Sequence, residues 1–192
     1  MILADYEIKQ LANEKGLIEP FTEDNQNIPN TLGTGLSSFG YDLSLSEKDF
    51  KIFQYIPGQI TDPKNFNENQ LMSVNPIRDH TGCFFILPSH SYGLGVAKEK
   101  IHLPFDSIAI ALGKSTYARS GIHCNVTPAE PGFEGYLTLE LSNSTPQDCK
   151  VYANEGICQL IFLVGNTCSV SYRHRGGKYQ NQKQEVVMSK VN

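Results

Sequence analysis

The sequence lacks several features that would place it in a specialised class of protein. Its five cysteines are scattered and odd in number, with no C-x-x-C pair, so they predict neither a disulfide framework nor a zinc knuckle. No apolar run approaches membrane-spanning length, and the first residues lack the pattern of a signal peptide. The net charge of −4 argues against a broad surface for nucleic acid. We therefore expect a soluble, cytoplasmic protein that binds neither membranes nor nucleic acid.

Familiar catalytic motifs are missing as well. The residues before Gly113 do not complete a Walker A phosphate loop. The histidines show no metal-ligand spacing, and the zinc deaminase signature H-x-E with P-C-x-x-C is absent. There is no G-x-S-x-G nucleophile motif. The sequence thus predicts no protein-bound metal and no serine hydrolase.

Sequence patterns predict one domain over residues 1–192, with residues from about 173 to 192 forming a flexible C-terminal arm. A helix is expected over Asp5–Lys15, with Asp5 as its N-cap and Gly16 as its stop. Residues 19–34 are rich in Asn, Pro and Gly and predict a loop. Residues 59–75 look irregular, with a turn at Asp62–Asn65.

The remainder predicts many short strands with turn residues between them. These are Ser37–Leu45, Lys51–Ile56, Cys83–Leu87, Tyr92–Ala97, Ser107–Leu112, Ile122–Val126, Gly135–Ser142, Lys150–Tyr152 and Gln159–Val164. There is no alternation of strands with helices, so a parallel Rossmann-type sheet is not expected. The pattern favours a mainly β fold: a sandwich, a jelly roll or a distorted barrel.

The segment GKSTYARSG, from Gly113 onward, is the first candidate for function. A glycine-led turn with Lys114, Ser115, Thr116 and Arg119 could bind phosphate oxygens. A polar surface loop, with Arg119 in a salt bridge, explains the same residues equally well. Spacing alone does not choose between the two.

The strand pattern that follows, Tyr136–Leu141, contains a second candidate functional residue. In Tyr136–Leu141 the leucines alternate with Tyr136, Thr138 and Glu140, so a core on the leucine side puts Glu140 on the opposite face. A solvated glutamate is the simpler interpretation. A general acid or base is the alternative, which gains weight if Ser115 and Arg119 share the site.

Two further segments could complete a pocket. The stretch Val126–Ala129, before a tight turn at Glu130–Gly135, could line a pocket and let its backbone contact a base edge. The segment SYRHRGGKYQNQ, from Ser171 to Gln182, offers several hydrogen-bond donors beside a flexible Gly-Gly pair. It predicts either a disordered basic tail or a lid over a polyphosphate.

Taken together, these motifs resemble the dCTP deaminase family of the trimeric dUTPase-like superfamily. The resemblance extends over nearly the whole chain and rests on SSFGYDLSL, FKIFQ, TDPKNF, GKSTYARSGI, NVTPAEPGFEGYLTLELSN, YANEGICQLIF and SYRHRGGKYQNQ. It implies a homotrimer of distorted β-barrels with active sites between neighbouring subunits. It also implies zinc-free hydrolysis of dCTP to dUTP and ammonia, with Mg²⁺ accompanying the triphosphate.

The resemblance also implies roles for individual residues. Glu140 would shuttle protons, with Ser115 positioning water and Arg119 stabilising charge. The nucleotide-binding segment would comprise Lys114, Ser115, Thr116, Tyr117, Ala118 and Arg119. Residues flanking the base would be Thr138 and Leu139, and residues holding sugar and triphosphate would be Gln159, Tyr172, Lys178 and Gln182.

Some details depart from the family pattern and leave alternatives. Lys114 stands where some relatives carry Arg, and Glu130 takes the place of an Asp in a shortened loop. The main alternative is a bifunctional enzyme that converts dCTP to dUMP and diphosphate. A nucleotide-binding regulator without catalysis is the alternative from another class. Inhibition by dTTP is known among relatives but does not follow from this sequence.

Overall fold

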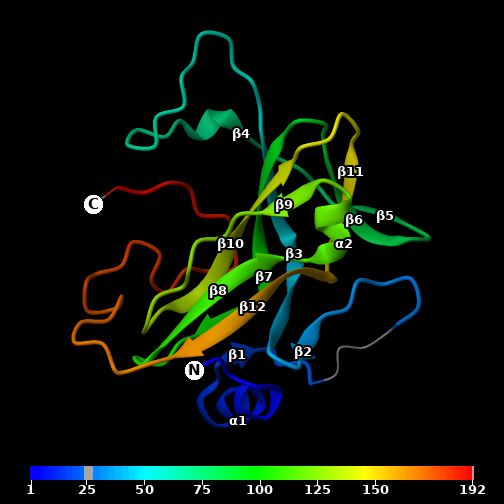
Figure 1. Ribbon diagram of the computed structural model, residues 1–192. Helices are drawn as coiled ribbons and strands as arrows, with labels where there is room; N and C mark the ends of the chain where they lie inside the picture. Colours follow the sequence, from blue (N-terminus) through cyan, green and yellow to red (C-terminus); the bar gives the residue numbers. More distant parts are fainter. Residues whose placement is uncertain (24–27, 192) are drawn as a thin grey trace.

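The computed structural model describes residues 1–23 and 28–191 and shows a strongly curved β structure with one helix against its end (Figure 1). These residues contain two α-helices, α1 (Asp5–Lys15) and α2 (Ser115–Arg119). Neither is long and apolar enough to cross a membrane, and no other described segment is helical over such a length. The strands are β1 (Ile18–Glu19), β2 (Gly35–Ser37), β3 (Gly40–Phe53), β4 (Leu71–Ser73), β5 (Ile77–Asp79), β6 (Gly82–Leu87), β7 (Tyr92–His102), β8 (Ser107–Gly113), β9 (Ile122–Cys124), β10 (Glu134–Asn143), β11 (Cys149–Tyr152) and β12 (Gly156–Val164).

Nine strands form one sheet that nearly closes into a barrel. Its main order is β8-β12-β3-β7-β10-β9, and all pairings are antiparallel. The two ends of this order approach each other where Ala109 of β8 and Ala129 exchange backbone hydrogen bonds of 3.0 and 2.8 Å. Closure of this kind leaves few free strand edges. The expectation of a mainly β, barrel-like fold is confirmed.

Strand β10 shows how the sequence pattern becomes the core. Leu137, Leu139 and Leu141 are buried, while Tyr136, Thr138 and Glu140 on the other face are partly accessible. Because side chains alternate along a strand, this pleat fixes both faces at once. Tyr41, Phe50, Phe85 and Phe162 are among the largest side chains in the same core.

Several element boundaries differ from those expected. Strand β3 runs without a break through 14 residues, so the two strands predicted over 37–45 and 51–56 are wrong as separate elements. The turn residues lie before Gly40 instead. Strand β12 pairs with residues 41–44 and β7 with Leu45 and residues 50–52, so the polar residues 46–49 form an irregularity within one continuous strand. Strand β5 and the 3-10 helix Glu68–Gln70 were not predicted.

The ends of α1 confirm one expectation and correct another. Gly16 ends the helix in the left-handed conformation, with φ of 63°. The N-cap is Ala4, not Asp5, and its backbone N–H donates to the carboxylate of Glu7 at 2.9 Å. Glu7 thus supplies one half of a capping box, while Ala4 has no side-chain oxygen to accept an N–H of the first turn. The predicted loop 19–34 lies partly outside the described residues.

The segment expected as a glycine-led turn is a short helix, α2. The Ala118 N–H donates to the carbonyl of Lys114 at 3.0 Å, and the run after Gly113 contains no residue that breaks a helix. Tyr117 is buried and anchors the helix, because its hydroxyl accepts the N–H of Tyr152 at 2.8 Å. Ser115, Thr116, Ala118 and Arg119 stay exposed.

The described part of the C-terminal arm lies against the barrel. The Asn181 N–H donates to the Glu134 carbonyl at 2.7 Å, and the Tyr136 N–H donates to the Gln182 carbonyl at 3.1 Å. Val186 is buried on the body. The arm thus docks along the start of β10 (Figure 1), while its flexibility stays a prediction.

Asn143 links the end of β10 to the second, smaller sheet, which has the order β11-β6-β5. Its side-chain amide is almost fully buried and donates to the carbonyls of Leu87, Pro88 and Gln147 at 3.0, 3.0 and 2.8 Å. Its Oδ1 accepts both the N–H and the hydroxyl of Thr145.

We predict that Asn143→Ala lowers the free energy of unfolding by about 3 kcal/mol, because it strands several buried partners at once. Urea unfolding of the purified protein measures this. The exposed Asn166 supplies the matched control, and Asn166→Ala should stay within about 0.5 kcal/mol of wild type. Equal stability of the two variants would contradict the role given to Asn143.

Candidate active site

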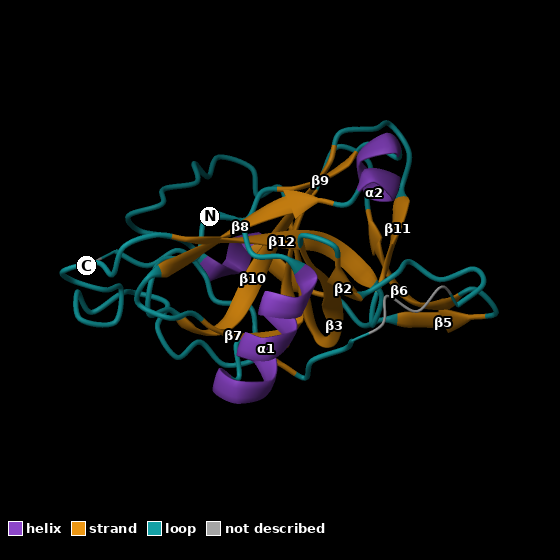
Figure 2. Cartoon of the chain, turned by 60° about the horizontal axis from the view of Figure 1, so that its bottom comes forward, coloured by secondary structure: helices purple, strands orange, loops and turns teal. Residues whose placement is uncertain are grey.

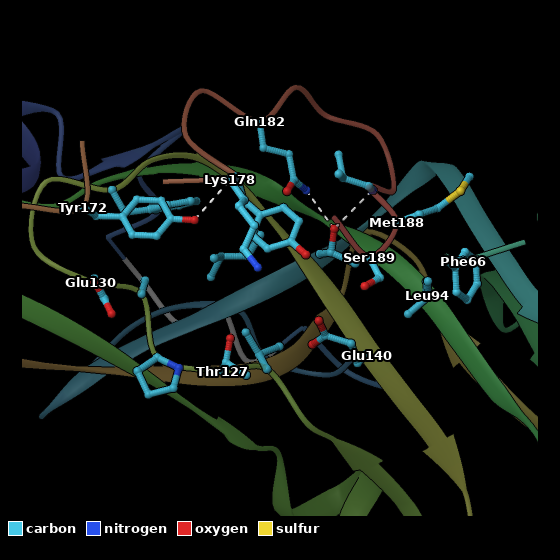
Figure 3. Close-up of a pocket in the computed structure, with 18 of the residues that line it drawn as sticks. Phe66, Leu94, Thr127, Glu130, Glu140, Tyr172, Lys178, Gln182, Met188 and Ser189 are labelled. Carbon is cyan, nitrogen blue, oxygen red and sulfur yellow. Dashed lines mark hydrogen bonds between the residues drawn. The ribbon is translucent and has the colours of Figure 1, made fainter. Parts of the chain in front are cut away.

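One cavity of about 650 Å³ opens beside the outer face of β10. Its walls come from β10, from the loop before it, from the loop after β3 and from the arm (Figure 3). Tyr172 and Glu130 lie toward one end, Phe66, Leu94 and Met188 toward the other, and Glu140 lies between them (Figure 3). The cavity thus joins a more polar end to an apolar one.

Glu140 is the unusual group in this cavity. Its side chain is half-buried, and its Oε2 atom is buried without a hydrogen-bond partner among the described residues. Burial raises the pKa of this carboxyl to about 7, because the charged form loses hydration and the residue's own backbone amide offsets that loss only in part. A carboxyl with that pKa can both accept and release a proton near neutral pH. The solvated glutamate considered from the sequence is not what the structure contains.

The backbone beside Glu140 is firmly held. Its carbonyl accepts the N–H of Asn125 at 2.8 Å, and its residue pairs in register with Leu94 of β7. Rigid strands on both sides fix where the carboxyl points, which is what a catalytic group requires. Leu139 next to it is fully buried and directs its side chain into the core.

Four other predicted site residues line the same cavity. They are Thr138, Tyr172, Lys178 and Gln182. Gln182 Nε2 donates to Thr138 Oγ1 at 2.8 Å (Figure 3). Tyr172 Oη accepts the N–H of Tyr179 at 3.0 Å, and Lys178 Nζ donates to the Lys190 carbonyl at 3.1 Å. Gln182 therefore ties the arm to β10, while Tyr172 and Lys178 make contacts to other residues of the arm.

The predicted nucleotide-binding segment does not line this cavity. Lys114 is the N-cap of α2, and residues 115–119 form this helix. It lies across the barrel from the C-terminal arm in both views (Figure 1 and Figure 2). Lys114 forms an ion pair with the buried Asp42. Gln159, another predicted site residue, pairs in register with Asp42 and donates to Ser37 Oγ at 2.9 Å. The predicted site residues therefore form two groups, one in the cavity and one around α2.

Sequence patterns indicated some of the cavity and missed the rest. The stretch Val126–Ala129 lines it, which confirms the expected pocket-lining role. Phe53, Phe66 and Met188 were not expected there, since they come from segments far apart in the chain. For Phe66 and Met188, an apolar side chain inside a polar, irregular segment was the available signal.

A second buried carboxyl was also missed. Glu99 is almost fully buried on β7, where its Oε2 accepts the N–H of Ser44 at 2.9 Å and burial raises its pKa. It stands in phase with Ala97 and Ile101, at a position where the strand pattern calls for an apolar residue. Within residues 1–23 and 28–191, no three His, Cys, Asp or Glu side chains gather closely enough to hold a metal ion.

Comparison with known proteins adds an independent line of support. The family model described as dCTP deaminase-like matches residues 2–164. A Campylobacter hominis protein named dCTP deaminase is 46% identical over 181 residues, which cover 94% of this chain and 91% of that protein. A Wolinella succinogenes protein of the same name is 48% identical over 177 residues, with coverages of 92% and 91%.

A solved structure supports the fold. The crystal structure of 2′-deoxycytidine 5′-triphosphate deaminase from Agrobacterium tumefaciens superimposes with a TM-score of 0.61 at 21% identity. The match covers 85% of this chain, which spans 48% of that longer chain. The resemblance noted in the sequence motifs is therefore confirmed by the family model, by the relatives and by the fold. This chain belongs to the dCTP deaminase-like family.

Proposed function

We propose that this protein hydrolyses dCTP to dUTP and ammonia without zinc, and so supplies dUTP for the synthesis of dUMP and dTTP. The observation that carries the proposal is the Glu140 carboxyl, which is largely desolvated in the cavity, has an Oε2 atom without a partner among the described residues, and has a pKa raised to about 7. The names of the relatives give the substrate. Magnesium would enter with the triphosphate, as part of the substrate.

The chemistry needs a group that moves several protons. Water adds to C4 of cytosine, N3 gains a proton, and ammonia then leaves with another. Ionised Glu140 would take a proton from the attacking water and deliver it to N3. It would then take the proton of the new C4 hydroxyl and deliver it to the amine, which leaves as ammonia while the C4 carbonyl forms. A carboxyl with an ordinary pKa would be a poorer proton donor in the second half of this sequence.

We infer that the complete site forms between copies of this chain, as a homotrimer. The cavity contains Glu140 and the donors of the arm, whereas Ser115, Thr116 and Arg119 of α2 are exposed and lie elsewhere on the same chain. A neighbouring copy that brought its α2 to the cavity would unite the two groups. Ser115 would then position the water, Arg119 would stabilise developing charge, and the exposed end of α2 would face the triphosphate.

The arm and the loop before β10 would hold the rest of the nucleotide. Lys178, Tyr172 and Gln182 offer an ammonium, a hydroxyl and an amide at the polar end of the cavity, which suits the sugar and triphosphate. The backbone at Thr127 would face the base. Glu130 lies at the same end, where a carboxylate can accept a hydrogen bond from a sugar hydroxyl.

We predict that the purified protein, given dCTP and Mg²⁺, accumulates dUTP and ammonia. The nucleotides are resolved by chromatography, with and without a zinc chelator. Equal dUTP formation in both reactions is the expected result. Appearance of dUMP and diphosphate would favour the bifunctional enzyme, and binding without any product would favour a regulator. Parallel reactions with added dTTP test feedback inhibition.

We predict that Glu140→Gln lowers turnover of dCTP by about 10²–10⁴-fold or more, the range for loss of a general acid or base. Glutamine cannot accept or release a proton as a carboxyl does. Because it keeps the size of the side chain, dCTP binding should survive in calorimetry. Glu134→Gln serves as the control, because Glu134 pairs with Lys100 at 2.5 Å and does not line the cavity. Wild-type turnover in Glu140→Gln would reject the mechanism.

We predict that kcat/KM falls about tenfold for each pH unit below the Glu140 pKa of about 7. The sign follows from the first step, because only the ionised carboxylate accepts the proton of water and acid converts it to the neutral form. Initial rates across a pH series measure the effect. A flat profile well below pH 7 would show that Glu140 is not the base.

A further inference from the structure

Strand β7 is irregularly paired on both of its sides at the same place. On the β3 side, Leu45 pairs with Ala97 and Phe50 with Gly95, so β3 carries three extra residues in a bulge. On the β10 side, Tyr136 pairs with Lys100 and Thr138 with Val96, so β7 has the extra residues there. Bulges re-aim side chains and interrupt regular pairing, often beside functional sites.

The C-terminal arm docks at these irregularities. Gln184 Nε2 donates to the carbonyls of Lys98 and Ala97, at 3.0 and 3.5 Å, within the stretch of β7 that bulges away from β10. Two residues further on, the Val186 N–H donates to Asp49 Oδ2 at 2.7 Å. Asp49 is the last residue of the β3 bulge before regular pairing resumes at Phe50.

Asp49 is well suited to hold a backbone amide. Its side chain is only 21% exposed, and Lys51 Nζ lies 4.0 Å from the same Oδ2 atom. A hydrogen bond to an ionised acceptor is roughly twice as strong as a neutral one. Val186 beside it is buried, which adds an apolar contact to the polar one.

This contact lies next to the cavity. Thr138 Oγ1 accepts hydrogen bonds from Gln182 Nε2 at 2.8 Å and from the Val187 N–H at 3.4 Å. The arm is therefore bound to the Glu140 face of β10 both before and after Val186. Val187, Met188 and Ser189 follow directly and form part of the cavity wall. The hydrogen bond from Val186 to Asp49 therefore also positions this part of the cavity wall.

We propose that Asp49 is a positioning residue: by binding the Val186 amide at the β3 bulge, it fixes the C-terminal arm over the cavity and so sets the affinity for the nucleotide. The residue touches no atom of the cavity and acts through the arm. The effect on the nucleotide rests on the proposed function, whereas the effect on the arm does not.

The first experiment measures hydrogen–deuterium exchange of the arm in the full-length, ligand-free protein. Asp49→Ala should speed exchange of the peptide that contains Val186 by at least about tenfold, equivalent to about 1.4 kcal/mol. Asp49→Asn keeps an acceptor oxygen without the charge and should give an intermediate rate. Unchanged exchange in the β12 peptide, residues 156–164, shows that the barrel stays folded.

Asp148 supplies a matched control. Its Oδ1 accepts the N–H of Ser89 at 2.9 Å, the same kind of contact, in a turn away from the arm. Asp148→Ala should leave exchange of the arm at the wild-type rate. Equal arm exchange in Asp49→Ala and Asp148→Ala would overturn the proposal.

The second experiment measures steady-state kinetics with dCTP. In Asp49→Ala we expect KM to rise about tenfold with a much smaller change in kcat, and partial recovery in Asp49→Asn. Faster arm exchange with an unchanged KM would overturn the link to the nucleotide. If the wild-type protein does not deaminate dCTP, the exchange experiment still decides whether Asp49 holds the arm, so the two proposals fail separately.

Discussion

The pleat of β10 is the constraint on which the rest of this structure depends. Leu137, Leu139 and Leu141 occupy the core, and the same alternation presents Thr138 and Glu140 to the cavity. A shift of one residue in pairing would bury Glu140 and expose the leucines. The apolar core thus enforces the position of the reactive face, because no other register satisfies both sides of the strand.

Glu140 illustrates a conflict between stability and function. Burial of the Glu140 carboxyl, with one oxygen left without a partner, destabilises its ionised form. This raises its pKa to about 7. Glu99 is buried more deeply but receives the Ser44 amide, so its burial has a structural compensation. Among residues 1–23 and 28–191 no such partner reaches Oε2 of Glu140, and this difference distinguishes a reactive carboxyl from a structural one.

The cavity is lined by residues from distant parts of the chain, including its C-terminal end. Its floor belongs to the barrel, but its wall needs the arm, whose position depends on bulges in β3 and β7 and on Asp49. Closure of the barrel also directs α2 away from this cavity. In the function proposed above, a single chain provides two separate groups of site residues, which a neighbouring copy would bring together.

The sequence by itself determined the fold class, the N-terminal helix, most strands and the phase that sets Glu140 opposite the leucines, since these follow from local periodicity. Its motifs also identified the family. Tertiary structure alone decided that β3 is continuous, that residues 115–119 form a helix, and that Phe66 and Met188 reach the cavity. Tertiary structure also decided the pKa of Glu140, because the segments that bury its carboxyl meet only in the folded chain.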